Sequence, residues 1–149
     1  MVNRFERFSF AIFEISHYWH KIASDVMEPY GLKGPNAVYF TALSRYSEGL
    51  TSGALGEVCS RDKSDVSRSL TIMEQKGLII KEYKDGNRYR ALVKLTEEGE
   101  KIAGEINEKA KQAVEIGGKG LSETDRANFY HSLDIVAGNL RKLSEDGLI

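Results

Sequence analysis

The spacing of apolar residues predicts long helices at both ends of the chain and shorter elements between them. Across residues 3–29, apolar side chains recur at alternating steps of three and four, the heptad pattern of a helix that packs along one seam. This seam consists of Phe5, Phe8, Ile12, Ile15, Trp19, Ile22 and Val26. A second stripe beside it contains Phe10, Phe13, His17 and His20. A helix with two such stripes must be covered by more than one neighbour.

Three short helices are expected after the first helix. Pro35 suits the first turn of the earliest one, and Gly49 ends it. Thr51 is expected to cap the second, and Asp62 the third, which ends at Gly77. Their inward-facing positions are predicted to be Val38, Phe40, Leu43, Leu55, Val58, Val66, Leu70 and Met73.

From residue 78 the apolar period falls to about two, which indicates strands over 78–83 and 88–95. The segment 84–87 between them contains Asp-Gly, a pair that favours the tight turn of a β-hairpin. Thr96 then caps a helix that runs to about residue 116, and Ser122 caps a last helix. That helix carries a second heptad seam, formed by Phe129, Leu133, Val136, Leu140 and Leu143.

The predicted fold class is therefore mainly α with a small β-hairpin wing (α+β), a winged helix-turn-helix flanked by N- and C-terminal dimerisation helices. Residues 32–96 form the expected DNA-binding domain, and residues 1–31 with 97–149 form the expected dimerisation region. Two seams at opposite ends of a short chain need partners, which favours a homodimer over packing of the terminal helices within one chain. The interface residues are predicted to be Phe5, Phe8, Ile12, Ile15, Trp19, Val136, Leu140 and Leu143.

The helix that starts after Asp62 combines an apolar back with an unusual polar side. A helix that enters the major groove needs short polar side chains near its N-terminus, a few cations beside them, and an apolar back that fixes its angle. The residues predicted to contact DNA from this helix are Lys63, Ser64, Asp65, Ser67, Arg68 and Thr71. The hairpin is predicted to add contacts to an adjacent minor groove from Lys84, Asn87, Arg88 and Arg90.

Charge is distributed unevenly along the chain, although the formal net charge is only -1. Residues 61–94 contain nine Lys or Arg and five Asp or Glu, a local net charge of +4. Positive charge concentrated in one segment is what a phosphate backbone attracts, so double-stranded DNA is the expected partner.

Residues 50–81, LTSGALGEVCSRDKSDVSRSLTIMEQKGLIIK, resemble the helix-turn-helix of the MarR family of bacterial transcriptional regulators. VKLTEEG, at residues 93–99, resembles that family's turn into its fifth helix. Asn87 and Tyr89 stand where the family usually has Asp-x-Arg, and Lys33-Gly34-Pro35-Asn36 lacks the family's common glutamine. The resemblance implies an obligate homodimer with intertwined terminal helices, usually a repressor of a palindromic operator.

The resemblance also implies a small aromatic or anionic effector, bound between the dimerisation helices and the winged unit, where His17, Tyr18 and His20 could line its site. Packing of these three residues against another part of the protein is the simpler interpretation of each. Glu14, His17 and His20 are also spaced to converge on a metal ion, which leaves a metal-responsive regulator of the same fold as an alternative. A winged-helix protein–protein interaction module without DNA contact is a third interpretation.

Several function classes receive no support from the sequence. No nucleophile–base motif or glycine-rich phosphate loop indicates an enzyme, and no cofactor is expected. Cys59 is the only cysteine and is expected to be a small buried apolar residue. No apolar run is long enough for a transmembrane helix and no secretion signal is evident, so a cytoplasmic protein is expected.

Overall fold

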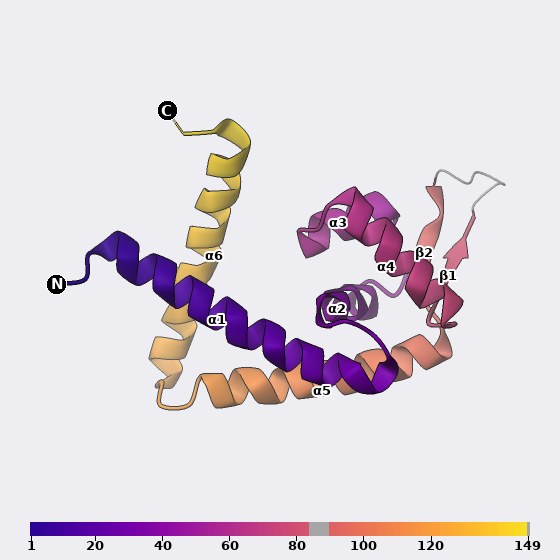
Figure 1. The fold of residues 1–149 in the computed structure, drawn as a ribbon, viewed down its shortest axis with the longest axis horizontal. Coiled ribbons are helices and arrows are strands. Elements are labelled where there is room, and N and C mark those ends of the chain that lie inside the picture. Colours follow the sequence, from indigo (N-terminus) through magenta and orange to yellow (C-terminus); the bar gives the residue numbers. More distant parts are fainter. Residues whose placement is uncertain (84–89, 149) are drawn as a thin grey trace. The chain divides into compact units, whose positions relative to one another are not determined.

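The computed structural model describes residues 1–83 and 90–148, and it shows helices with one two-stranded sheet (Figure 1). In chain order the elements are α1 (Arg4–Met27), η1 (Glu28–Tyr30), η2 (Gly34–Asn36), α2 (Ala37–Arg45), α3 (Ser52–Cys59), α4 (Lys63–Gln75), β1 (Ile79–Glu82), β2 (Leu92–Leu95), α5 (Glu97–Gly117) and α6 (Glu123–Asp146). The two strands are antiparallel, with Ile79 opposite Leu95. The predicted fold class, mainly α with a small β element, is confirmed. The predicted turn at 84–87 lies outside the described residues.

The chain divides into two compact units, Met1–Ala110 and Lys111–Ile149. The first unit contains α1 to β2 and most of α5, and the second contains the end of α5 and all of α6. Within the described parts of the chain, no helix combines the length and the apolar content that crossing a bilayer requires.

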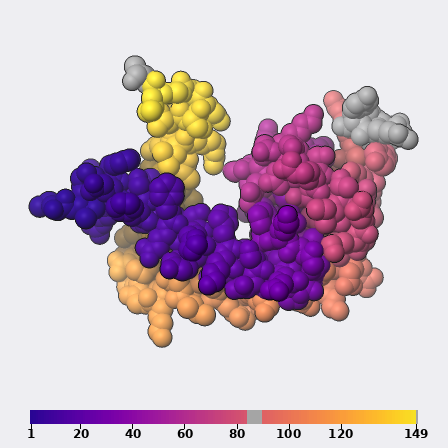
Figure 2. Space-filling model, in the orientation of Figure 1, coloured from indigo at the N-terminus to yellow at the C-terminus, as the bar shows by residue number. Residues whose placement is uncertain are grey.

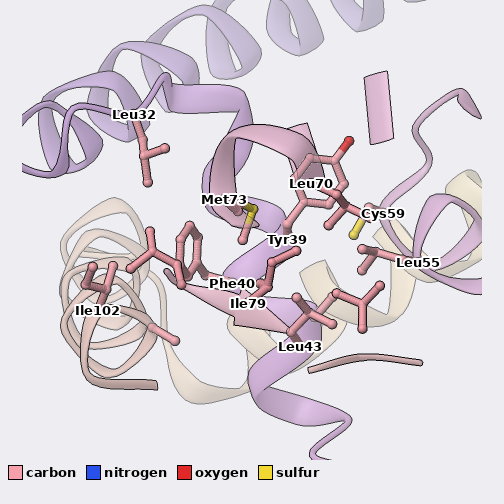
Figure 3. Packing of buried hydrophobic residues seen from close by; sticks show 14 of the residues in the cluster. Leu32, Tyr39, Phe40, Leu43, Leu55, Cys59, Leu70, Met73, Ile79 and Ile102 are labelled. Atoms are coloured by element: carbon pink, nitrogen blue, oxygen red, sulfur yellow. The ribbon is translucent and has the colours of Figure 1, made fainter. Parts of the chain in front are cut away.

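The first unit is built on one apolar core to which the short helices, the sheet and α5 all contribute (Figure 3). The largest fully buried side chains in it are those of Tyr39, Phe40, Met27, Leu55, Leu70, Met73, Ile79, Val66 and Val93. At Gly99, near the start of α5, a Cβ atom would overlap the carbonyl oxygen of Leu78. The absent side chain therefore lets α5 pack closely against the chain that leads from α4 into β1.

Local capping signals set most helix ends at the residues that the sequence predicts. The side chains of Thr51, Asp62 and Ser122 each accept a hydrogen bond from a backbone N–H in the first turn of their helix. Asn3 caps α1 in a reciprocal pair with Glu6. These bonds satisfy N–H groups that have no partner within the helix, so they fix where each helix begins.

One predicted core position is wrong. The sequence predicts that Val58 faces inward with Leu55, but 47% of its surface is exposed. The buried side of α3 runs from Leu55 to Cys59, a step of four, so Val58 is rotated toward solvent.

In the second unit, the turn between α5 and α6 is fixed by Arg126. Its Nη1 donates to Glu115 Oε2 at 2.7 Å, and its Nη2 donates to the Gly118 carbonyl oxygen at 3.0 Å. One guanidinium thus bridges the end of α5 and the chain that leads into α6.

Candidate nucleic-acid interface

Helix α4 presents a solvent-exposed polar side above a buried apolar back. Asp62 Oδ1 accepts from the Asp65 backbone N–H at 2.7 Å, which starts the helix, and Gly77 with φ of 73° lets the chain turn away after it. Val66, Leu70 and Met73 are buried in the core of the first unit. The helix is therefore held by its back, and its other side faces outward (Figure 2).

Five of the six α4 residues predicted to contact DNA lie on this outward side: Lys63, Ser64, Ser67, Arg68 and Thr71. Arg68 Nη1 donates to Ser64 Oγ at 2.8 Å, which lays the guanidinium along the helix surface. Thr71 Oγ1 donates to the Ser67 carbonyl oxygen at 2.9 Å. Arg68 keeps its other N–H donors, and the exposed Thr71 keeps oxygen lone pairs and a methyl group, so this side offers donors, acceptors and apolar contact.

Asp65, the sixth residue, is directed elsewhere. At about 100° per residue, it falls roughly 120° around the helix from Thr71. Its Oδ1 accepts from the Tyr39 hydroxyl at 3.0 Å and from Ser69 Oγ at 3.1 Å. Its Oδ2 lies 3.6 Å from Arg61 Nη1. The carboxylate is thus engaged with α2 and with its own helix.

Two clefts border the polar side of α4. The first, of about 460 Å³, lies between α3 and α4, and the second, of about 680 Å³, lies between the starts of both helices and the sheet. Lys63 and Lys81 line both clefts. The first cleft is also lined by Arg61 and by Glu57. The second cleft is also lined by Arg90, and its described lining residues include no carboxylate.

The first turn of α3 also opens onto these clefts, through Ser52 and Gly53. Thr51 Oγ1 accepts from the Ala54 N–H at 3.1 Å, which leaves the N–H groups of Ser52 and Gly53 without a helical partner. A helix N-terminus beside the three cations of each cleft creates a positive environment suited to an anion such as a phosphate group.

The residues predicted for the wing are only partly within the described structure. Arg90 is exposed and lines the second cleft, as Tyr83 does. Lys84, Asn87 and Arg88 lie outside the described residues.

Two residues that line these clefts, Lys81 and Arg61, were not predicted from the sequence to belong to the site. Lys81 lies in β1, where the alternating pattern identifies a strand but not what its side chain approaches. Both residues belong to the basic segment 61–94, and that clustering is the one available signal.

The two predicted heptad seams, which include the predicted dimerisation residues, form exposed apolar surfaces. On α1, the side chains of Phe5, Phe8, Ile12, Ile15, Trp19 and Ile22 are 42–76% exposed. On α6, those of Phe129, Leu133, Val136, Leu140 and Leu143 are 36–48% exposed. The apolar side chains of each seam are therefore largely exposed.

The residues considered for ligand binding on α1 are exposed as well. The His17 and Tyr18 rings meet edge to face with centroids 5.1 Å apart, and Tyr18 and His20 project from different sides of the helix. Neither of the two clefts is lined by these residues. Among the described residues, no group of three or more His, Cys, Asp or Glu side chains could hold a metal ion.

Cys59 is buried at the end of α3, as predicted. Its Sγ lies 3.8 Å from the Val38 carbonyl oxygen, and burial raises the pKa of its thiol above the usual range. The thiol is accordingly part of the core.

Comparison with known proteins identified similar folds but no matching sequence family. No family model matches the chain, and no curated protein matches it. A MarR transcriptional regulator from Methanosarcina mazei Go1 superposes with a TM-score of 0.82 at 23% identity, covering 93% of this chain and 99% of that one. A MarR-family regulator from Listeria monocytogenes, solved with 26mer DNA, gives 0.84 at 20% identity over 93% and 94% of the two chains.

A third structure, the MepR–DNA complex of S. aureus, gives a TM-score of 0.79 at 20% identity, covering 88% of this chain and 96% of that one. Each similarity spans nearly the whole of both chains. The order of helices and the two-stranded sheet are therefore those of the winged-helix fold found in these regulators.

Proposed function

We propose that this chain, which has the winged-helix fold of MarR-family transcriptional regulators, is itself a sequence-specific DNA-binding regulator of that family. The observation that carries the proposal is the exposed polar side of α4 next to two clefts lined by cations. Solved structures of this fold include complexes with DNA. We therefore call α4 the recognition helix.

In this proposal the recognition helix lies in the major groove of double-stranded DNA. Ser64, Ser67 and Thr71 supply short groups that can approach base edges, and Thr71 adds a methyl group for contact with thymine. Arg68 is long enough to reach either a guanine or a phosphate. Its hydrogen bond to Ser64 already orients the guanidinium, so less side-chain freedom is lost on binding.

The clefts would receive the DNA backbone next to that groove. Lys63, Lys81 and Arg90 surround the second cleft without an opposing carboxylate among its described lining residues. The free N–H groups at the start of α3 face the same space and can donate to phosphate oxygens. We expect Lys84, Asn87 and Arg88 to extend these contacts from the wing into the adjacent minor groove.

We further propose that the protein acts as a homodimer through residues 1–31 and 97–149, with residues 32–96 bound to DNA. The exposed seams of α1 and α6 support this, because apolar surfaces of such extent are normally covered by a partner. A two-fold symmetric dimer presents two recognition helices and therefore favours a palindromic site. Bound to an operator in the cytoplasm, it would act as a repressor by obstructing transcription.

Regulation by a small aromatic or anionic effector is the remaining part of the proposal. The exposed rings of His17 and Tyr18, with His20 nearby, offer stacking and hydrogen-bonding groups to such a molecule. Fluorescence of Trp19, adjacent to Tyr18 in α1, would report binding when aromatic carboxylates are titrated into the protein. A Tyr18→Ala variant that responds like the wild type would exclude this location.

Selection of duplexes from a random library by the purified protein tests the central proposal. We expect enrichment of one palindromic sequence, and binding that weakens as salt rises. A protein–protein interaction module would enrich no sequence.

Lys81→Ala tests the phosphate contacts in the clefts. It should lower the slope of log affinity against log salt by about 0.9, the value for one lost phosphate contact on duplex DNA. Lys109→Ala removes the same charge from α5, outside both clefts, and should leave the slope unchanged. Equal slopes for both variants would show that the clefts do not hold the backbone.

A further inference from the structure

A hydrogen-bond network around Asp65 connects the first turn of α4 to the buried interior of α2. The Tyr39 side chain is fully buried in the core, with 0% of its surface exposed (Figure 3). Its hydroxyl donates to Asp65 Oδ1 at 3.0 Å, and the buried Ser69 donates to the same oxygen at 3.1 Å. Arg61, on the rim of the first cleft, lies 3.6 Å from the other carboxylate oxygen. The carboxylate of Asp65 therefore contacts a core residue of α2, a buried residue of its own helix and a cation that lines the first cleft.

The direction of this carboxylate separates it from its neighbours on the helix. Ser64 and Ser67, on either side of Asp65 in the sequence, are exposed on the polar side, whereas Asp65 is partly buried. A carboxylate on the polar side would repel the phosphates on either side of the groove. Turned toward Tyr39 and paired with Arg61, it instead accepts hydrogen bonds that stay within the protein.

We propose that Tyr39 and Asp65 form a positioning pair, which sets the orientation of the recognition helix on the DNA and thereby the operator selectivity of the protein. The inference rests on the proposed function, because it assigns a role within DNA recognition. Asp65 then acts through the position of Ser64, Ser67, Arg68 and Thr71, and it does not contact bases itself.

The chemistry of the pair suits this role. Burial and the hydrogen bond to Asp65 raise the pKa of Tyr39 to about 12, so the hydroxyl keeps its proton and remains a donor throughout the physiological range. The Tyr39 ring is enclosed by the core, so its hydroxyl is a fixed point on α2. A hydrogen bond from a fixed donor restricts how the first turn of α4 can tilt, and the helix carries Ser64 and Ser67 at this end.

The test compares variants by their selectivity, the ratio of affinity for the selected duplex to affinity for a scrambled duplex of equal length. Tyr39→Phe keeps the ring and removes only the hydroxyl. We expect it to lower selectivity about three- to tenfold, as loss of one hydrogen bond allows, while the salt slope on the scrambled duplex stays unchanged. Tyr46→Phe removes a hydroxyl from the C-cap of the same helix and should leave selectivity at the wild-type value.

The pattern of lost selectivity distinguishes positioning from direct contact. A tilted helix weakens preference at several base pairs of each half-site, whereas a lost base contact affects one. Asp65→Ala should reproduce the broad loss, and the variant with both Tyr39→Phe and Asp65→Ala should be no less selective than Asp65→Ala alone.

Wild-type selectivity in Tyr39→Phe would overturn the inference, and so would an Asp65→Ala effect confined to one base pair. If Tyr39→Phe does not fold, Asp65→Ala decides alone, since it removes the acceptor of the same hydrogen bond. A loss of preference at several base pairs in that variant supports the pair, and wild-type selectivity rejects it. A wild-type protein that binds all duplexes equally would instead remove the proposed function.

Discussion

Replacing Leu140 and Leu143 together by Asp should separate the proposed dimer, because it places charge in the middle of the α6 seam. The five seam residues on α6 are each 36–48% exposed. Fully burying a large apolar side chain contributes about 1.5–3 kcal/mol, so covering roughly two fifths of one contributes about 0.6–1.2 kcal/mol. The α6 seams of two copies would then supply about 6–12 kcal/mol.

The α1 seam is more exposed, and by the same reasoning two copies would add about 9–18 kcal/mol. Together the seams exceed the cost of association, which is about 4–15 kcal/mol. The wild type should therefore be a dimer at micromolar concentration. The double substitution affects four positions per dimer and adds four carboxylates to an apolar interface, each with a desolvation cost of several kcal/mol. We therefore expect the free energy of dimerisation to weaken by at least about 6 kcal/mol, which raises the Kd of the dimer by about four orders of magnitude.

Sedimentation velocity at micromolar protein distinguishes the 16.7 kDa monomer from a species of twice that mass. Circular dichroism on the same samples shows whether the separated chains stay folded. Ala127→Asp with Gly138→Asp adds the same two charges at exposed positions roughly 160–180° around α6 from the seam, at about 100° per residue, and should remain dimeric. A monomeric wild type, or a dimeric Leu140→Asp/Leu143→Asp variant, would refute the reasoning.

Three other outcomes follow from side-chain burial and position. Leu70→Ala should lower the free energy of unfolding, measured in urea, by about 2–5 kcal/mol because it leaves a cavity in the core, and Ser64→Ala should leave that free energy unchanged. A larger loss of stability in Ser64→Ala than in Leu70→Ala would contradict the assignment of Leu70 to the buried face of α4 and Ser64 to the exposed face. Replacing Arg88 and Arg90 by Ala should weaken binding to all duplexes similarly and reduce the salt slope by about one unit per lost phosphate contact, and an unchanged slope would remove the wing from the interface. Cys59 should react with a maleimide far more slowly in the native chain than in urea near neutral pH, because burial raises its pKa and blocks access, and equal rates would show an open thiol. Since its folded pKa is raised, its stabilising contribution is present below the ordinary thiol pKa and is lost as pH rises through the folded value.

The sequence predicts the ends and the buried and exposed faces of α4 well because the signals are local. Asp62 at the start and Gly77 after the end act on adjacent backbone, and Val66, Leu70 and Met73 follow the helical period. The prediction for Val58 is wrong because steps of three and four from Leu55 are both helical. Val58 and Cys59 are therefore both expected to be buried, and only the packing of α3 on its neighbours leaves Val58 exposed.

The surroundings of the helix could not be predicted in the same way. Sequence spacing groups Asp65 with its neighbours, because it does not reveal that the hydroxyl of Tyr39, 26 positions earlier, reaches its carboxylate. Lys81 lines the same clefts as Lys63 only because β1 packs beside the helices. Such contacts depend on how separate elements pack against one another. They cannot be predicted from the hydrophobic period or from the spacing of residues within a single helix or strand.

The most direct test of the account is the duplex selectivity of a variant in which Ser64, Ser67, Arg68 and Thr71 are all replaced by Ala. These side chains are exposed, so the variant should fold with a wild-type thermal transition. Affinity for the selected palindrome and for a scrambled duplex is measured for both proteins at one salt concentration. We expect the variant to keep the weak, salt-dependent binding that both duplexes share and to lose preference for the palindrome, since each base contact contributes about 1–3 kcal/mol of discrimination. A variant that still prefers the palindrome as strongly as the wild type would show that α4 does not read DNA sequence.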